Sequence, residues 1–306
     1  MSSGPALAAT VCGIRLRNPV IAASGTFAYG VEFEKLLDLN ALGGLVVKGL
    51  SREPMEGNPP PRIYETRAGM LNSIGLQNIG VRAFVRQKLP RLAKLGTAVF
   101  ANIFGYQVED YVEVARALED HPGLAGYELN VSCPNTHRGG IYFSSDPGLL
   151  SELISAVKRV ARRPLMVKLS PNVSAIEPLA RAAEESGADA LSLVNTFIGL
   201  AIDPRTRRPR LGGGTGGLSG PAIKPIALRL VFEAARAVRI PVIGMGGIAS
   251  GADAAEFLIA GASAVQVGTA TFADPKAPLK IARELEAFLS RQKIASVNDL
   301  VGALKL

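Results

Sequence analysis

The feature that most constrains the fold is an alternation of strand-like and helix-like segments that runs along the whole chain. Eight short apolar, β-prone runs are each followed by a longer helix-like stretch. The strands are expected at Asn18–Ser24, Gly44–Lys48, Thr97–Ile103, the stretch that opens at Tyr127, Pro164–Leu169, Ala190–Asn195, Pro241–Met245 and Ala264–Val267. The helices are expected at Glu32–Leu39, Val81–Leu95, Glu109–Glu119, Asp146–Val160, Ala175–Ser186, Ala222–Val238, Ala252–Ile259 and Pro278–Gln292. Eight such units predict a parallel (β/α)8 TIM barrel, because a doubly wound open sheet needs fewer units and a glycine fingerprint after its first strand.

Several local signals support these boundaries and predict loop insertions. Val11–Leu16 reads as a lead-in strand, and Gly187 closes its helix. Two long segments, Gly49–Asn78 and Phe197–Gly220, are rich in glycine; the first is expected to be irregular, and loops of this length are uncommon unless they serve a site. With 306 residues, the chain is expected to form a single barrel domain, 1–306, with insertions over its active site.

Polar side chains stand at or just after the ends of several predicted strands. They are Ser24, Lys48, Asn102, Asn130, Lys168 and Asn195. Each could simply bond to a nearby backbone carbonyl, since buried lysine and asparagine need partners. The carboxyl ends of barrel strands meet at one mouth, however, and that mouth is where active sites form. Six such positions therefore predict one site.

Glycines after the last two strands predict a phosphate site. The chain carries Gly244-Met245-Gly246-Gly247-Ile248 and then Gly268-Thr269. Tight turns also use glycine, but barrels often bind phosphate after strands seven and eight, where backbone N–H groups can approach closely. The expected ligand is a phosphorylated cofactor lying across the mouth.

The segment from Tyr127 to Asn135 begins as a strand and ends as a loop carrying the thiol of Cys133. Pro134 cannot donate to a sheet, so the strand should stop before it. A lone cysteine is often a small apolar filler in a core. A loop thiol over a cofactor mouth, followed by Gly139 and Gly140 as hinges, instead points to a base or nucleophile.

Composition excludes several other classes of protein. Cys12 and Cys133 are the two cysteines and His121 and His137 the two histidines, so no four-cysteine cluster and no zinc spacing is present, and no metal is expected. The net charge of +8 comes from scattered residues and from Arg205–Arg210, a cluster without aromatic residues, so no nucleic-acid partner is expected. No apolar run has the length of a membrane span and no secretory signal is visible, so the expectation is a cytoplasmic protein away from membranes.

Taken together, these motifs resemble those of the class 1 dihydroorotate dehydrogenases over nearly the whole chain. They are Val47-Lys48-Gly49, Asn72-Ser73-Ile74-Gly75-Leu76-Gln77-Asn78, Asn130-Val131-Ser132-Cys133-Pro134-Asn135, Val167-Lys168-Leu169-Ser170-Pro171-Asn172, Val194-Asn195-Thr196, Gly216-Gly217-Leu218-Ser219-Gly220, Gly246-Gly247-Ile248 and Gly268-Thr269. The continuation 135–140 and the loop into Gly216 most resemble subclass 1B, the NAD-linked catalytic subunit.

The resemblance implies an FMN-dependent oxidation of dihydroorotate to orotate in pyrimidine biosynthesis. Cys133 would take the C5 proton, the C6 hydride would pass to flavin N5, and Lys168 would stand near flavin N1 and O2. The implied FMN contacts are Ser24, Lys48, Gly49, Asn102, Asn130, Lys168, Val194, Gly220, Gly246, Gly247, Gly268 and Thr269. The implied substrate contacts are Lys48, Asn72, Ser73, Ile74, Gly75, Leu76, Asn130, Asn195 and Thr196.

Subclass 1B also implies a partner. A second subunit would carry FAD and a [2Fe–2S] cluster and pass electrons to NAD, in a heterotetramer built on a homodimer of catalytic chains. The alternatives are a fumarate-linked class 1A enzyme, a dihydropyrimidine dehydrogenase module and a flavin-storing barrel without activity. Cys133 and the lack of an amino-terminal extension oppose class 2, which uses serine as base.

Overall fold

The computed structural model of the chain describes residues 4–131 and 140–306, and within these ranges eight parallel strands close into a barrel. Their order around the barrel is β10-β15-β16-β3-β4-β7-β8-β9. The strands are β3 (Val20–Ala22), β4 (Gly44–Leu50), β7 (Ala98–Ile103), β8 (Gly126–Asn130), β9 (Leu165–Lys168), β10 (Ala190–Leu193), β15 (Val242–Met245) and β16 (Ala264–Val267). The last strand closes on the first, with Val265 opposite Val20. The predicted barrel is confirmed.

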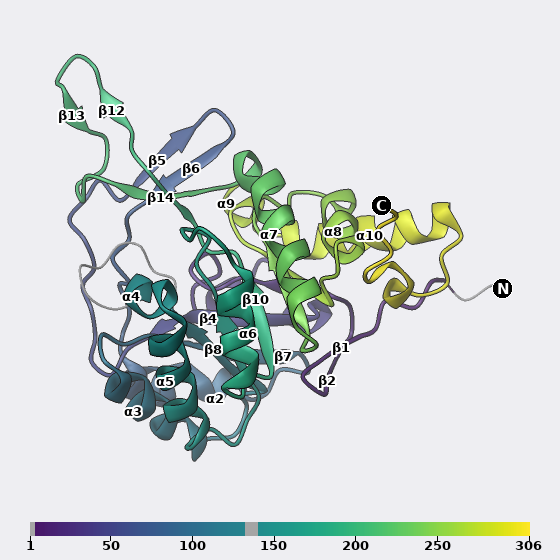
Figure 1. Ribbon diagram of the computed structural model, residues 1–306, viewed down its shortest axis with the longest axis horizontal. Coiled ribbons are helices and arrows are strands. Elements are labelled where there is room, and N and C mark those ends of the chain that lie inside the picture. The colour runs from purple at the N-terminus through teal and green to yellow at the C-terminus, as the bar shows by residue number, and fades with distance from the viewer. Residues whose placement is uncertain (1–3, 132–139) are drawn as a thin grey trace.

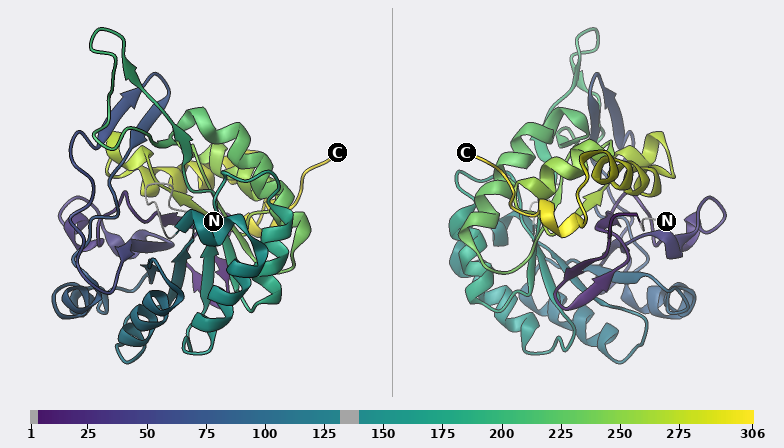
Figure 2. Two further views of the ribbon diagram at one scale, coloured as in Figure 1. Left: turned by 60° about the vertical axis from the view of Figure 1, so that its left-hand side comes forward. Right: turned by 90° about the vertical axis from the view of Figure 1, so that its right-hand side faces the viewer.

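Helices surround the strands (Figures 1 and 2). The described α-helices are α1 (Val81–Gln87), α2 (Leu89–Leu92), α3 (Val108–Glu119), α4 (Gly140–Ser145), α5 (Pro147–Lys158), α6 (Glu177–Glu185), α7 (Lys224–Ala237), α8 (Gly251–Ile259), α9 (Ala270–Ala273) and α10 (Ala277–Gln292). Asp146 caps α5, since its carboxylate accepts from Leu149 N at 3.0 Å, and Pro147 opens the helix. None of these helices, in the part of the chain that the structure describes, is long and apolar enough to cross a bilayer.

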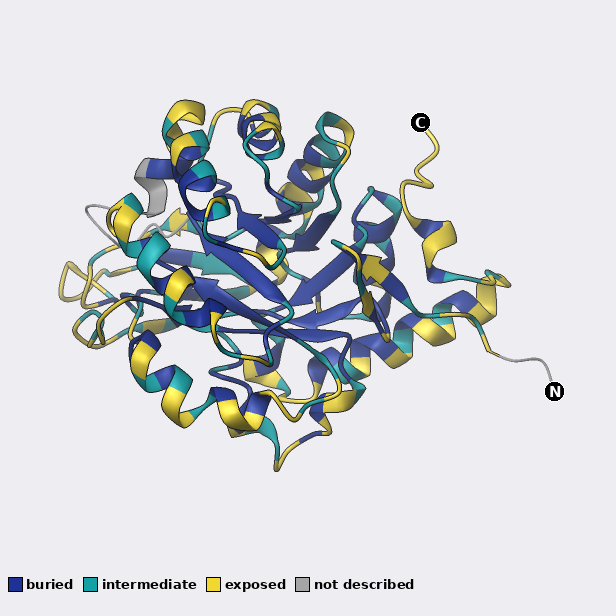
Figure 3. Cartoon of the chain, turned by 90° about the horizontal axis from the view of Figure 1, so that it is seen from below, coloured by how far each residue is buried: buried dark blue, intermediate teal, exposed yellow. Residues whose placement is uncertain are grey.

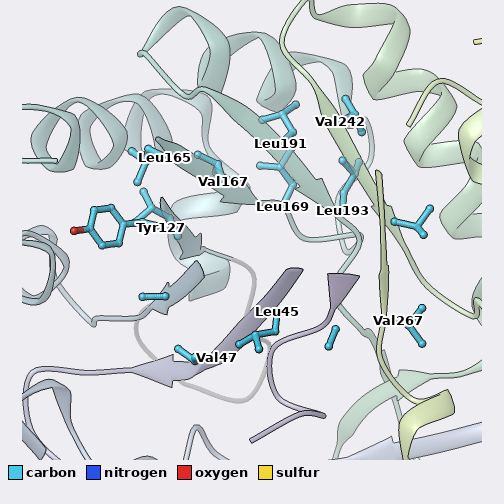
Figure 4. Packing of buried hydrophobic residues seen from close by; sticks show 14 of the residues in the cluster. Leu45, Val47, Tyr127, Leu165, Val167, Leu169, Leu191, Leu193, Val242 and Val267 are labelled. Atoms are coloured by element: carbon cyan, nitrogen blue, oxygen red, sulfur yellow. The ribbon is translucent and has the colours of Figure 1, made fainter. Parts of the chain in front are cut away.

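The main core lies between the strands and the surrounding helices. Successive strand residues face opposite sides of the sheet, so the residues that point out of the barrel meet the helices. Figure 4 shows this outer set on β4, β8, β9, β10, β15 and β16, with Leu45, Val47, Tyr127 and Val167 among its labelled members. Seen from below in Figure 3, the barrel strands are mostly buried while the outer faces of the helices are exposed.

Inside the barrel, an apolar level at the amino end of the strands gives way to a polar level nearer the mouth. The apolar level consists of Ile21, Val46, Phe100, Met166, Ala190, Ile243 and Ala264, capped from below by Val11 and Leu16. On β4, β7, β9, β10 and β16, the residue two positions after the apolar one is polar. These polar residues, together with one on β8, are Lys48, Asn102, Glu128, Lys168, Ser192 and Gln266. Because the strand repeat is two, both levels occupy the inner face. The switch from apolar to polar marks the floor of the mouth.

The two long insertions are not irregular, which corrects the expectation for Gly49–Asn78. They join in one antiparallel sheet of order β11-β14-β6-β5, and the second also forms a small ladder of β12 and β13. The strands are β5 (Ile63–Thr66), β6 (Gly69–Asn72), β11 (Phe197–Gly199), β12 (Ile202–Asp203), β13 (Arg208–Pro209) and β14 (Gly216–Ser219). In Figure 1 they extend beyond one end of the barrel. A Cβ at Gly217 would lie 2.0 Å from Thr196 Oγ1, so glycine is needed for this approach.

Two predicted helices differ from the structure. Instead of a helix at Glu32–Leu39 there are two 3-10 helices, η1 (Val31–Phe33) and η2 (Leu39–Ala41). The helical path is broken at Asp38, whose backbone is extended and whose carboxylate accepts from Asn40 N at 3.0 Å. The predicted helix Val81–Leu95 divides into α1 and α2 at Lys88, two residues before Pro90. In a continuous helix, the proline ring would clash with the preceding turn. The separate helix α4 was not predicted.

The lead-in segment Val11–Leu16 is a hairpin rather than one strand. β1 (Ala9–Val11) pairs with β2 (Ile14–Leu16) through a turn in which Cys12 and Gly13 both have positive φ, 51° and 74°. The Cys12 thiol donates to Asp189 O at 3.2 Å, and burial raises the pKa of this thiol to about 12. The hairpin closes the amino end of the barrel, opposite the mouth. Among the described residues, 3-10 helices also occur before α7 as η3 (Pro221–Ile223) and after α10 as η4 (Val297–Leu300).

Candidate active site

A cavity of about 1030 Å³ opens at the carboxyl ends of the barrel strands, beneath the inserted sheet. The predicted residues that line it are Ser24, Lys48, Gly49, Asn72, Ile74, Gly75, Leu76, Asn102, Asn130, Lys168, Val194, Asn195, Thr196, Gly220, Gly246, Gly247, Gly268 and Thr269. The structure thus brings together residues from the barrel strands and from both insertions. That these residues bind a ligand remains a prediction.

Two predicted site residues are not placed at the cavity. Cys133 lies outside the described residues. Ser73 does not line the cavity; its side chain is buried and its hydroxyl accepts from Asn58 Nδ2 at 2.8 Å. The Ser73 side chain therefore links two parts of the first insertion by a hydrogen bond. The neighbouring Asn72 and Ile74 face the cavity because side chains alternate along an extended chain.

The centre of the floor is the carboxylate of Glu128, which has no exposed surface. Its Oε1 accepts from Asn102 Nδ2 at 2.7 Å and from Ser24 Oγ at 3.3 Å. Its Oε2 accepts from Gln266 Nε2 at 2.7 Å and from Ser192 Oγ at 2.9 Å. Four donors stabilise a buried negative charge, and charge-assisted bonds of this kind are strong.

Lys168 supplies the matching cation. Its Nζ lies 3.9 Å from Glu128 Oε1 and donates to Ser24 Oγ at 3.3 Å. The Lys168 side chain is only 7% exposed, so the ammonium charge is held in place beside the cavity rather than in solvent. Lys168 was predicted from the sequence as a polar group at this mouth, and the structure places it there.

Two buried acceptors of the floor have no hydrogen-bond partner among the described residues. They are Asn102 Oδ1 and Gln266 Oε1, on side chains that are each 1% exposed. Their orientation follows from Glu128, since a carboxylate only accepts and the two amide NH₂ groups must therefore face it. Buried carbonyl oxygens without a donor are costly, and both residues line the cavity. Both oxygens thus keep unused capacity to accept a hydrogen bond beside the cavity.

A second cation, Lys48, lies at the end of the polar level on β4. Burial lowers the pKa of Lys48 from its ordinary value, and the nearby positive charge of Arg62 lowers it further. A bound carboxylate would offset both effects, because an opposite charge favours the ammonium form. Lys48 is therefore suited to an anionic ligand.

Glycines form the other end of the cavity, next to β14 and β15. Gly220, Gly246 and Gly247 have φ of 96°, 128° and 76°, a region that side chains disfavour. A Cβ on Gly247 would come within 2.8 Å of both Gly220 O and Lys224 Cβ. Glycine is needed at this position because the chain itself packs where a side chain would lie. That this end of the cavity binds a phosphate remains a prediction.

Sequence reasoning missed Glu128 and Gln266 as site residues, and also Lys280 of α10, which lines the cavity. The signal for Glu128 was present: a charged residue alternates with Tyr127 and Leu129 inside a strand that is buried on both faces. Gln266 stands in the same way between apolar neighbours in β16.

Comparison with known sequences gives the family. The family described as "Dihydroorotate dehydrogenase" matches residues 6–289. The chain belongs to the dihydroorotate dehydrogenase family. It is 78% identical to "Putative dihydroorotate dehydrogenase A (fumarate)" of Solibacter usitatus over 98% of this chain and 99% of that protein. It is 55% identical to "Dihydroorotate dehydrogenase B (NAD(+)), catalytic subunit" of Citrifermentans bemidjiense over 99% of both chains.

A solved structure agrees on the fold. The crystal structure of DHODH in complex with ferulenol from Eimeria tenella matches with a TM-score of 0.82 over 97% of this chain and 88% of that one. The sequence identity of 24% restricts this likeness to the fold. The family membership fits the resemblance found in the motifs, while the two relatives are named for different electron acceptors.

Proposed function

We propose that this chain oxidises dihydroorotate to orotate with FMN held in the barrel mouth. The observation that carries the proposal is the polar floor: in a chain of this family, one cavity combines a held cation, two acceptors without a partner among the described residues, and a glycine-lined end. This combination matches a planar ring with N–H and carbonyl edges joined to a phosphate.

The residues present fit FMN. Asn102 Oδ1 and Gln266 Oε1 can accept from donor groups of the flavin, and Lys168 would stand beside the ring edge where negative charge develops on reduction. Gly246, Gly247 and Gly268 line the same cavity as Lys280, so their backbone N–H groups and this cation would hold the phosphate. FMN would supply the acceptor for the hydride that leaves C6 of the substrate.

The remaining polar residues of the cavity would hold and deprotonate the substrate. Lys48 would bind the substrate carboxylate, while Asn72, Asn130 and Asn195 would bond to the amide groups of its ring. We assign the base to the thiolate of Cys133: it removes the C5 proton, and the C5–H electron pair forms the C5=C6 double bond as the C6 hydride leaves. In this assignment the chain itself handles the proton and positions the reacting atoms.

We propose NAD as the final acceptor, reached through a partner subunit that carries FAD and a [2Fe–2S] cluster. Relatives from several organisms at 52–55% identity are named as B (NAD(+)) catalytic subunits, which supports this route. The relative from Solibacter usitatus is named for fumarate, so the fumarate-linked enzyme is the second candidate. In the NAD-linked form, two catalytic chains would join two electron-transfer subunits.

The substrate assignment is tested by anaerobic mixing of the FMN-loaded chain with dihydroorotate or with dihydrouracil. We expect dihydroorotate to bleach the flavin absorbance in one turnover and dihydrouracil to leave it unchanged, because dihydrouracil lacks the carboxylate for Lys48. Bleaching by dihydrouracil alone would overturn the substrate assignment. Rapid reoxidation of the bleached chain by fumarate, without any partner, would select the second candidate for the acceptor.

A further inference from the structure

Glu128 has no role in the proposed chemistry, yet its side chain lies at the centre of the floor. Its carboxylate is fully buried, accepts four hydrogen bonds and lies 3.9 Å from the Lys168 ammonium. A buried acid in a strand is costly unless its partners are all in place. Because this arrangement is costly for stability, we infer that Glu128 has a role in function.

The first consequence of Glu128 concerns the two amides of the floor. Since the carboxylate accepts from Asn102 Nδ2 and Gln266 Nε2, both amide oxygens must point away from it. Neither oxygen has a partner within the described residues, and both residues line the cavity. Glu128 thus decides that the floor presents acceptors rather than donors.

The second consequence concerns charge. Lys168 alone would place an unbalanced positive charge at the floor, and a reduced, anionic flavin would gain more from it than an oxidised, neutral one. The carboxylate of Glu128 at 3.9 Å balances that charge. It lowers the preference of the floor for the reduced ring while keeping the ammonium fixed.

We propose that Glu128 is a positioning residue that sets both the hydrogen-bond polarity and the net charge of the cofactor floor, and through them the relative affinity of the chain for oxidised and reduced FMN. The inference rests on the proposed function, because it takes FMN as the occupant of the cavity. Glu128 touches neither cofactor nor substrate in this arrangement and acts through Asn102, Gln266 and Lys168.

The variant Glu128→Gln tests both halves. A glutamine has one acceptor oxygen and one NH₂ group, so its NH₂ must face Asn102 or Gln266 and force one of these amides to turn. We expect oxidised FMN to bind at least tenfold more weakly, measured by fluorescence titration of the apoprotein. We also expect the ratio of affinities, reduced over oxidised, to rise at least tenfold, which is an upward shift of about 30 mV for a two-electron couple. The potential is measured by anaerobic equilibration with a reference dye.

Two further variants separate these effects. Ser192→Ala removes one donor to Glu128 but keeps its charge, and Ser192 does not line the cavity. The affinity ratio of Ser192→Ala should stay within about threefold of the wild type, because one hydrogen bond is lost while the charges of Glu128 and Lys168 are both kept. Gln266→Met approximately keeps the volume but removes one acceptor and, like Ser192→Ala, one donor to Glu128. FMN should therefore bind more weakly to this variant, while the affinity ratio again stays within about threefold of the wild type.

The outcomes decide between the claims. Failure of the wild-type chain to bind FMN refutes the proposed function itself. Normal FMN binding by the wild type, with an unchanged or lowered ratio in Glu128→Gln, overturns the role of Glu128. Should Glu128→Gln not fold, Gln266→Met still decides the polarity claim, because unaltered FMN affinity in that variant would contradict it.

Discussion

The pair formed by Lys168 and Glu128 gives a prediction that needs no cofactor. Replacing Lys168 with Met keeps much of the length of the side chain but leaves the buried carboxylate without its cation. At 3.9 Å and an effective dielectric constant of about 20, the attraction between the two charges is about 4 kcal/mol. Breaking a buried pair on one side usually costs about 3–5 kcal/mol, and the four remaining donors to Glu128 favour the lower end. We therefore expect Lys168→Met to lower the free energy of unfolding of the apoprotein by about 3 kcal/mol.

A double-mutant cycle isolates the contribution of the pair. Urea unfolding of the wild type, Lys168→Met, Glu128→Gln and the double variant should give a coupling energy of about 2 kcal/mol, with unchanged dependence on urea concentration. The exposed pair Arg229 and Glu233, 2.6 Å apart on α7, is the control and should couple by only about 0.3–0.5 kcal/mol. Additive effects of the two floor variants, within about 0.5 kcal/mol, would refute the reasoning that the two charges interact.

Three other outcomes are expected. Gly247→Ala should lower the melting temperature of the apoprotein, because the added Cβ would lie 2.8 Å from neighbouring atoms at a φ of 76°. Gly268→Ala should leave it unchanged, because a Cβ there would have no atom nearer than 3.7 Å. Equal melting temperatures of the two variants would contradict this reasoning. The affinity of the FMN-loaded chain for orotate should fall as the pH rises through the lowered pKa of Lys48, because binding favours the protonated amine. The fall should begin below the ordinary lysine pKa of about 10.4 and should be absent in Lys48→Arg. Identical pH profiles of the wild type and Lys48→Arg would exclude Lys48 as the anion contact. An alkylating reagent at pH 8 should leave Cys12 unmodified, since burial raises the pKa of Cys12 to about 12 and keeps it a thiol, and should label Cys133 in the folded chain; mass spectrometry showing the reverse would contradict the assignment of the two thiols.

The barrel could be predicted from the sequence because its signals are local and repeated. Apolar runs such as Gly44–Lys48 and Ala264–Val267 recur with helix-like stretches between them, and each indicates a strand without reference to the others. The polar ends of these strands could likewise be assigned to one mouth, since parallel strands in a barrel share a carboxyl edge. The placement of Lys48, Asn102 and Lys168 around one cavity follows from this rule.

What could not be predicted depends on contacts between distant segments. The insertions pair with each other, Gly217 opposite Asn72, and nothing in either segment alone indicates its partner. In the sequence, Glu128 is an ordinary polar residue in an alternating strand. Its role depends on four donors that come from four other strands or strand ends, and only the fold brings them together. The missing first helix has a local cause instead, because Asp38 adopts an extended backbone and its side chain caps η2 rather than continuing a helix.

The central claim is that the cavity above Glu128 and Lys168 holds a flavin with the thiol of Cys133 over it. The most direct measurement is a crystal structure of the chain with FMN and orotate. We expect flavin density between Lys168 and Gly247, with orotate stacked on the ring and the sulfur of Cys133 facing the C5 atom of orotate. A flavin bound elsewhere on the chain, or a Cys133 side chain turned away from orotate, would contradict it.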